Sequence, residues 1–90
     1  MVQPTPRSQA SIFRRAYYGA VSFTDRNVGA MLDELSALQL AERTLVALVG
    51  DHGWQLGEMD LWRKMSNFEL AVRVPLLMRV PWRPASLGRR

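Results

Sequence analysis

The sequence predicts an α/β fold in which a long helix is followed by a buried parallel strand, a polar loop and a second strand. Three features carry this prediction. Apolar side chains recur at helical spacing over 11–40, a continuous aliphatic run follows at 44–49, and that run ends abruptly in a polar turn. A strand that is apolar on both faces is typical of a parallel sheet flanked by helices.

The helix is predicted from a stripe of apolar residues between 11 and 40. Its members lie three, four or seven positions apart, which places them on one helix face: Tyr17, Val21, Val28, Leu32 and Leu35. Ser11 is the expected N-cap, and no proline interrupts the segment before Leu40. The apolar stripe therefore predicts a helix that packs against a sheet.

Two strands are predicted after the helix, separated from it by a short polar connection at 41–43. The first is 44–49, and the second is 72–80, where Pro75 weakens the start and leaves 76–80 as the better half. Joined by the intervening loop, these elements suggest a right-handed crossover unit. Such a unit cannot cover both faces of its own sheet, so we expect a piece of a larger α/β protein.

Composition excludes several classes of protein. With 48% apolar residues the chain is too hydrophobic for disorder over most of its length, and no apolar run is long enough for a membrane span or a signal peptide. The net charge is +4, but the basic residues are scattered without interleaved aromatic residues, so we expect no nucleic-acid partner. No cysteine is present to form a disulfide or a cysteine-based zinc site.

Three segments are expected along the chain. Residues 1–10 are polar, contain Pro4 and Pro6, and are predicted to form a disordered leader. Residues 11–87 hold the helix, the loop and both strands, and form the partial domain. Residues 88–90 are a short tail.

Candidate metal ligands follow the first predicted strand. Asp51 and His52 stand between Gly50 and Gly53, where ligands of open α/β sheets bind. A carboxylate offers oxygen ligands suited to Ca²⁺ or Mg²⁺, and an imidazole can join a metal or carry protons. The alternative is purely structural, with Asp51 capping a turn and His52 bonded to the backbone.

Lys64 is the candidate substrate-binding residue. It lies about a dozen residues beyond His52, and its flexible ammonium could reach back to hold an anionic group. Alternatively it is an ordinary solvated lysine. Glu58 and Asp60 are either further ligands or surface carboxylates. The loop also contains two aromatic residues, Trp54 and Trp62, which are expected to form its wall.

This loop and several flanking stretches resemble the sulfatases. The similarity runs from Arg14 to Leu87. Its most specific part is the Asp-His-Gly-Trp-Gln-Leu-Gly-Glu motif at 51–58, followed by Trp-Arg-Lys at 62–64. Further matching stretches lie at 15–25, 28–29, 66–68, 74–77 and 84–87.

The resemblance implies a fragment of an alkaline-phosphatase-like sulfatase domain and a calcium-dependent sulfuric ester hydrolase. Asp51 and His52 match residues of the family's Ca²⁺ site, and Lys64 matches the lysine that contacts the sulfate. The implied substrate is the sulfated uronic acid of a glycosaminoglycan, and the implied location is the lysosome. In this family a cysteine converted to formylglycine is the nucleophile.

The sequence also departs from the sulfatase pattern. It has no cysteine, so formylglycine is absent from this chain and no catalytic nucleophile is assigned; the isolated chain is expected to be inactive. Gly50 replaces the usual serine, and Met59-Asp60 replaces the usual His-Gly. Two alternatives remain: a non-catalytic partial-gene or splice product that acts as an interaction fragment, and a phosphodiesterase or phosphonate hydrolase of the same superfamily.

Overall fold

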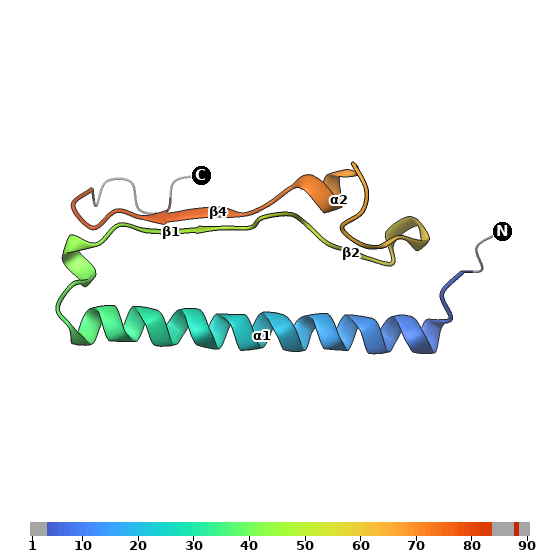
Figure 1. Ribbon diagram of the computed structural model, residues 1–90, viewed down its shortest axis with the longest axis horizontal. Coiled ribbons are helices and arrows are strands. Elements are labelled where there is room, and N and C mark those ends of the chain that lie inside the picture. Colours follow the sequence, from blue (N-terminus) through green and yellow to red (C-terminus); the bar gives the residue numbers. More distant parts are fainter. Residues whose placement is uncertain (1–3, 84–87, 89–90) are drawn as a thin grey trace.

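The computed structural model describes residues 4–83 and 88. A single long helix, α1 (Arg7–Ala37), lies along one side of the molecule, and an extended layer of short strands runs beside it (Figure 1). The strand pair β1 and β4 faces the C-terminal half of α1, and β2 faces the N-terminal half. The molecule measures 56 × 24 × 18 Å. It is therefore an elongated two-layer structure.

The predicted helix is confirmed, but its first turn was misplaced. It begins at Arg7 with Pro6 as its N-cap, and not at Ser11. Residues 7–10, which the sequence assigned to a disordered leader, are therefore helical. The fixed φ of a proline suits the residue that enters a helix, and the missing N–H costs nothing there.

The helix also ends earlier than predicted, at Ala37. Gln39 has a φ of 58°, and its N–H donates to Ser36 O while the Leu40 N–H donates to Leu35 O. These two bonds form a Schellman motif, which satisfies the last carbonyl groups of a helix. The chain then turns through the short 3₁₀ segment η1 (Ala41–Arg43) toward the first strand.

Both predicted strands are present, but the predicted parallel arrangement is wrong. Strand β1 (Val46–Val49) pairs antiparallel with β4 (Leu76–Arg79), with Val46 opposite Arg79. The segment between them leaves the end of β1 and returns to that same end, so β4 runs in the opposite direction. It contains the hairpin β2 (Gln55–Leu56) and β3 (Trp62–Arg63), the turn η2 (Glu58–Asp60) and the one-turn helix α2 (Glu69–Val72). No crossover helix carries the chain back, as parallel pairing requires.

The strands are also less buried than predicted. In β1 only Val46 is partly buried, and all four residues of β4 are exposed. Among the described residues, only Ala71 and Gln55 are buried. The radius of gyration is 17.7 Å, against about 12 Å for a compact domain of this length. The two layers therefore enclose very little interior.

Aromatic pairs hold α1 against the hairpin. The ring of Phe13 meets Trp62 edge-on at 5.3 Å, and Tyr17 stacks on Trp54 at 6.1 Å between ring centres. At the other end, Arg79 of β4 donates to Ala41 O and pairs with Glu42 at 2.8 Å. These contacts fix the loop between β1 and β4 relative to the helix.

Two further sequence expectations concern the ends of the chain and membranes. The predicted boundary between domain and tail lies beyond Arg83, where Gly88 alone is described. Within the part of the chain that the structure describes, no helix is both long and apolar enough to cross a membrane.

Candidate functional site

The polar turn after β1 is clamped by backbone hydrogen bonds on both sides. The Gly50 N–H donates to Pro75 O at 3.1 Å, and the Gly53 N–H donates to Ala71 O at 2.8 Å. Gly53 lies so close to the neighbouring chain that an added Cβ would overlap the Leu70 carbonyl oxygen. Only glycine permits this approach. The turn that carries Asp51 and His52 is thereby fixed against the loop that precedes β4.

Asp51 and His52 lie together at this turn, as predicted. The Asp51 Oδ1 accepts a hydrogen bond from the His52 N–H at 3.0 Å, and its Oδ2 is 3.2 Å from His52 Nε2. The Asp51 side chain is 84% exposed, whereas that of His52 is 27% exposed. The carboxylate is therefore open to a ligand, and the imidazole is held partly inside.

Lys64 reaches the same point from the far side of the hairpin. Its Nζ lies 2.7 Å from His52 Nε2. The residue before it, Arg63, ends β3 with a φ of 74°, a backbone conformation that is uncommon outside glycine. Lys64 is exposed, but it contacts His52 and is not simply a solvated surface lysine. The structure thus brings the three predicted site residues together.

The hydrogen bonds of His52 define its tautomer. Its Nδ1 lies 2.8 Å from Gly53 O, which can only accept, so Nδ1 carries the proton. An ammonium group can only donate, so the Nε2 that faces Lys64 presents its lone pair. The Nε2 lone pair and the Asp51 carboxylate thus lie side by side, with a cationic group bonded to the nitrogen. Lys64 occupies this lone pair, so a metal ion can use it only when Lys64 turns to another partner, whereas the carboxylate is open.

The donor set fits calcium in part. The exposed Asp51 carboxylate is a hard oxygen ligand of the kind Ca²⁺ takes, whereas an imidazole nitrogen is better suited to transition metals. Ca²⁺ takes about six to eight ligands, and the described residues contain no group of three or more His, Cys, Asp or Glu side chains that could hold a metal. The turn can therefore supply a share of a calcium site.

The hydrogen bonds of the purely structural alternative, in which Asp51 caps the turn and His52 bonds to the backbone, are also present. The bond from the His52 N–H to Asp51 and the bond from His52 Nδ1 to Gly53 O are both present. They use only one carboxylate oxygen and one ring nitrogen, so Asp51 Oδ2 and the His52 Nε2 that bonds Lys64 take no part in them. The structural bonds and a ligand-binding role are thus compatible.

The other loop residues are assigned more simply. Glu58 accepts a hydrogen bond from the Leu56 N–H at 2.6 Å and so stabilises the hairpin turn. Asp60 lies in the same turn, beside a hollow that also contacts α1. Trp54 and Trp62 pack against helix residues, as the sequence predicts for the wall of the loop. Neither carboxylate forms a hydrogen bond or ion pair with Asp51.

Two polar residues near the site were not predicted. Gln55 is 1% exposed, and its Oε1 accepts a hydrogen bond from Ser66 Oγ at 2.8 Å, while its Nε2 has no partner among the described residues. Arg14 of α1 donates from Nε to Leu56 O at 2.9 Å. Gln55 gives no local sequence signal because polar residues are ordinarily exposed, and Arg14 is 42 positions from its partner.

Comparison with known protein families gives a match over nearly the whole chain. The sulfatase family model matches residues 2–87. The chain therefore belongs to the sulfatase family, as its loop motif predicts.

Individual relatives make the similarity more specific. The chain is 46% identical to the human (Homo sapiens) iduronate 2-sulfatase over 84 residues, which is 93% of the chain and 15% of that enzyme. It is 43% identical over 68 residues to the choline-sulfatase of Rhizobium meliloti, covering 76% of the chain and 13% of the relative. Arylsulfatase K of Mus musculus is 38% identical over 74 residues, covering 82% of the chain and 13% of that enzyme. The chain thus spans about one seventh of the length of the curated relatives it matches.

Proposed function

We propose that the chain supplies part of the active site of a calcium-dependent sulfuric ester hydrolase that resembles iduronate 2-sulfatase. The proposed substrate is the sulfated uronic acid of a glycosaminoglycan, and the proposed location is the lysosome. One observation carries the proposal: His52 Nε2 lies 2.7 Å from Lys64 Nζ and 3.2 Å from Asp51 Oδ2. A carboxylate, an imidazole and an ammonium thus meet at one point of the sulfatase motif.

Asp51 and His52 are the proposed metal-site residues. When bound, Ca²⁺ would offset negative charge on the oxygens of the ester. Asp51 can offer its exposed carboxylate to the ion, and His52 is oriented by its bond to Gly53 O so that Nε2 faces the site. Such a bond fixes the ring and its tautomer.

Lys64 is the proposed sulfate-binding residue. Its ammonium is a compact point charge with three donors, which can stabilise a sulfate oxygen as the ester bond breaks. The side chain is exposed and bonded only to His52 among the described residues. Lys64 can therefore exchange its contact with His52 for one with an anion.

The nucleophile must come from elsewhere, because the chain contains no cysteine from which formylglycine could form. We infer that the chain alone is inactive. The alternative of an interaction fragment has one observation in its favour. Many large apolar side chains are exposed, among them Phe23, Met31, Leu76 and Leu77, each more than 60% exposed.

A chimera tests the proposed function. Residues 2–87 replace the matching segment of the human iduronate 2-sulfatase, which supplies the remaining residues of a complete enzyme. We expect hydrolysis of a sulfated uronic-acid substrate and no comparable hydrolysis of the corresponding phosphate ester. Lys64→Ala should lower kcat/KM by an amount that corresponds to about 2–4 kcal/mol of lost transition-state stabilisation, as removal of an oxyanion donor does. The matched control is Arg73→Ala, which removes an exposed cation that pairs only with Glu69 on α2.

Three results would contradict the proposal. A folded chimera without sulfatase activity would leave the interaction fragment as the better account. Preference for the phosphate ester would favour the phosphodiesterase alternative. Equal activity of the Lys64→Ala and Arg73→Ala chimeras would remove Lys64 from the substrate site.

A further inference from the structure

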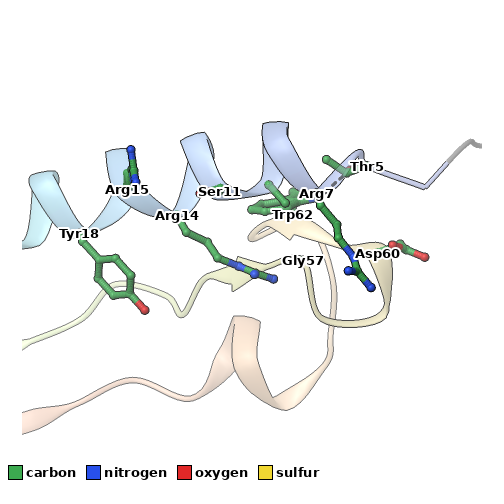
Figure 2. A pocket seen from close by; sticks show the side chains of 10 residues that line it. Thr5, Arg7, Ser11, Arg14, Arg15, Tyr18, Gly57, Asp60 and Trp62 are labelled. Atoms are coloured by element: carbon green, nitrogen blue, oxygen red, sulfur yellow. Dashed lines mark hydrogen bonds between the residues drawn. The ribbon is translucent and has the colours of Figure 1, made fainter.

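A basic hollow of about 550 Å³ lies between the first turns of α1 and the β2–β3 hairpin. Figure 2 shows Arg7, Arg14 and Tyr18 extending from α1 toward the hairpin, with Trp62 at the helix and Asp60 beyond the tip of Arg7. Arg15 also lines the hollow, but its guanidinium points the other way in this view. The hollow therefore has two inward-reaching cations from a single helix face.

Arg14 is held in place before any ligand arrives. Its Nε donates to Leu56 O at 2.9 Å, and its guanidinium carbon lies 5.9 Å from the centre of the Trp62 ring. Its two terminal nitrogens have no hydrogen-bond partner within the described part of the chain. A guanidinium fixed in this way can bind an oxyanion with two parallel hydrogen bonds at little entropic cost.

Further hydrogen-bond donors line the same hollow as Arg14. Arg7 has no polar partner in the residues that the structure describes, and it lies about 10 Å along the helix axis from Arg14. The Thr5 hydroxyl accepts from Trp62 Nε1 at 2.9 Å, so its own proton remains available. Asp60 is the one carboxylate of the lining, and it leaves the positive charge of the arginines in excess.

We propose that this hollow binds a second anionic group, a sulfate or carboxylate, of the sulfated saccharide whose reacting sulfate is held by Lys64. This inference rests on the proposed function. Hydroxyl and guanidinium donors suit the charged and polar groups of such a sugar, and the Trp62 ring offers an apolar face beside them. Trp62 and Lys64 are two residues apart, so their Cα atoms are at most about 7 Å apart. The hollow and Lys64 are thus close along the chain, and the proposal requires a saccharide that extends past Trp62 from one to the other.

Binding of a trisulfated heparin-type disaccharide to the 90-residue chain tests this inference. The readout is the ¹⁵N–¹H signal of the Trp62 indole, whose N–H lies at the hollow. We expect a saturable shift of this signal. Arg7→Gln with Arg14→Gln should weaken binding about tenfold or more, the scale for losing hydrogen bonds to a charged group. The matched control is Arg26→Gln with Arg43→Gln, which removes the same charge outside the hollow and should change the affinity less than about twofold.

Arg7→Gln alone guards against a folding artefact, because Arg7 makes no hydrogen bond or ion pair among the described residues that the fold could lose. It should weaken binding by itself and leave the helical circular dichroism unchanged. Lys64→Ala should weaken the affinity, because Lys64 is proposed to hold another sulfate of the same saccharide, but the Trp62 shift should still saturate at higher saccharide concentration. If Lys64→Ala leaves the affinity unchanged, the hollow is still supported and only the proposed role of Lys64 fails. Equal weakening by both double variants, no saturable shift, or equal binding of a single-stranded oligonucleotide of the same charge would overturn the inference.

Discussion

Replacing Gly53 by alanine should open the turn that carries Asp51 and His52. The added Cβ would overlap the carbonyl oxygen of Leu70 and lie 3.0 Å from that of Arg73. Both obstacles are backbone atoms, so the two chain segments must separate. Overpacking of this kind costs about 1–3 kcal/mol. The hydrogen bond from the Gly53 N–H to Ala71 O would be lost as well, at about 0.5–1.5 kcal/mol.

Amide hydrogen exchange measures this effect at the turn itself. A combined cost of about 1.5–4.5 kcal/mol corresponds to roughly 10- to 1,600-fold faster exchange. If the native turn is protected from exchange by less than this factor, the amides of Gly50 and of residue 53 should lose their protection completely. The control is Gly29→Ala, because nothing lies within 4 Å of a Cβ at that position of α1. That variant should stabilise the helix by up to about 1 kcal/mol. Similar exchange at the turn in the two variants would refute the packing argument.

Three further outcomes follow from the site and the fold. The ¹⁵N signals of the His52 ring should show a protonated Nδ1, and Lys64→Ala should shift the Nε2 signal; an unshifted Nε2 would mean that the 2.7 Å contact is not populated. Calorimetric titration of the 90-residue chain with Ca²⁺ should show no micromolar site, because Asp51 and His52 supply few of the ligands that Ca²⁺ needs; micromolar affinity would contradict this. The accessible surface of 8190 Å², against about 5,400 Å² for a compact protein of this mass, should lead to strong binding of an apolar dye, and a chain that binds none would be more compact than described.

The sequence predicted the elements better than their arrangement. The helix was found because its apolar spacing is a local signal, and strands β1 and β4 were found because aliphatic runs are local too. The first turn of α1 was missed because Ser11 is the more common type of N-cap, whereas Pro6 holds that position. The antiparallel pairing could not be deduced, since it depends on the path of the whole loop between β1 and β4.

In the candidate site, too, the contacts between sequence neighbours could be predicted and the long-range contacts could not. Asp51 and His52 are adjacent and follow a strand, so their proximity was certain from the sequence. The contact of Lys64 with His52 depends on the β2–β3 hairpin, which lies in the segment that the sequence predicts only as a loop between two strands. In the basic hollow, Arg14 bonds to Leu56, which is 42 positions away in the sequence. No local sequence pattern predicts a contact over that separation.

The calcium dependence of two variants tests the central claim, that Asp51 and Lys64 serve one site in different ways. In the chimera with the human enzyme, kcat/KM is measured on a sulfated uronic-acid substrate across a calcium series. Asp51→Asn weakens the proposed metal ligand, so its defect should shrink as Ca²⁺ is raised. The defect of Lys64→Ala, about 2–4 kcal/mol of transition-state stabilisation, should persist at every concentration. Rescue of both variants by Ca²⁺ to the same degree, or wild-type activity of Lys64→Ala, would contradict the account.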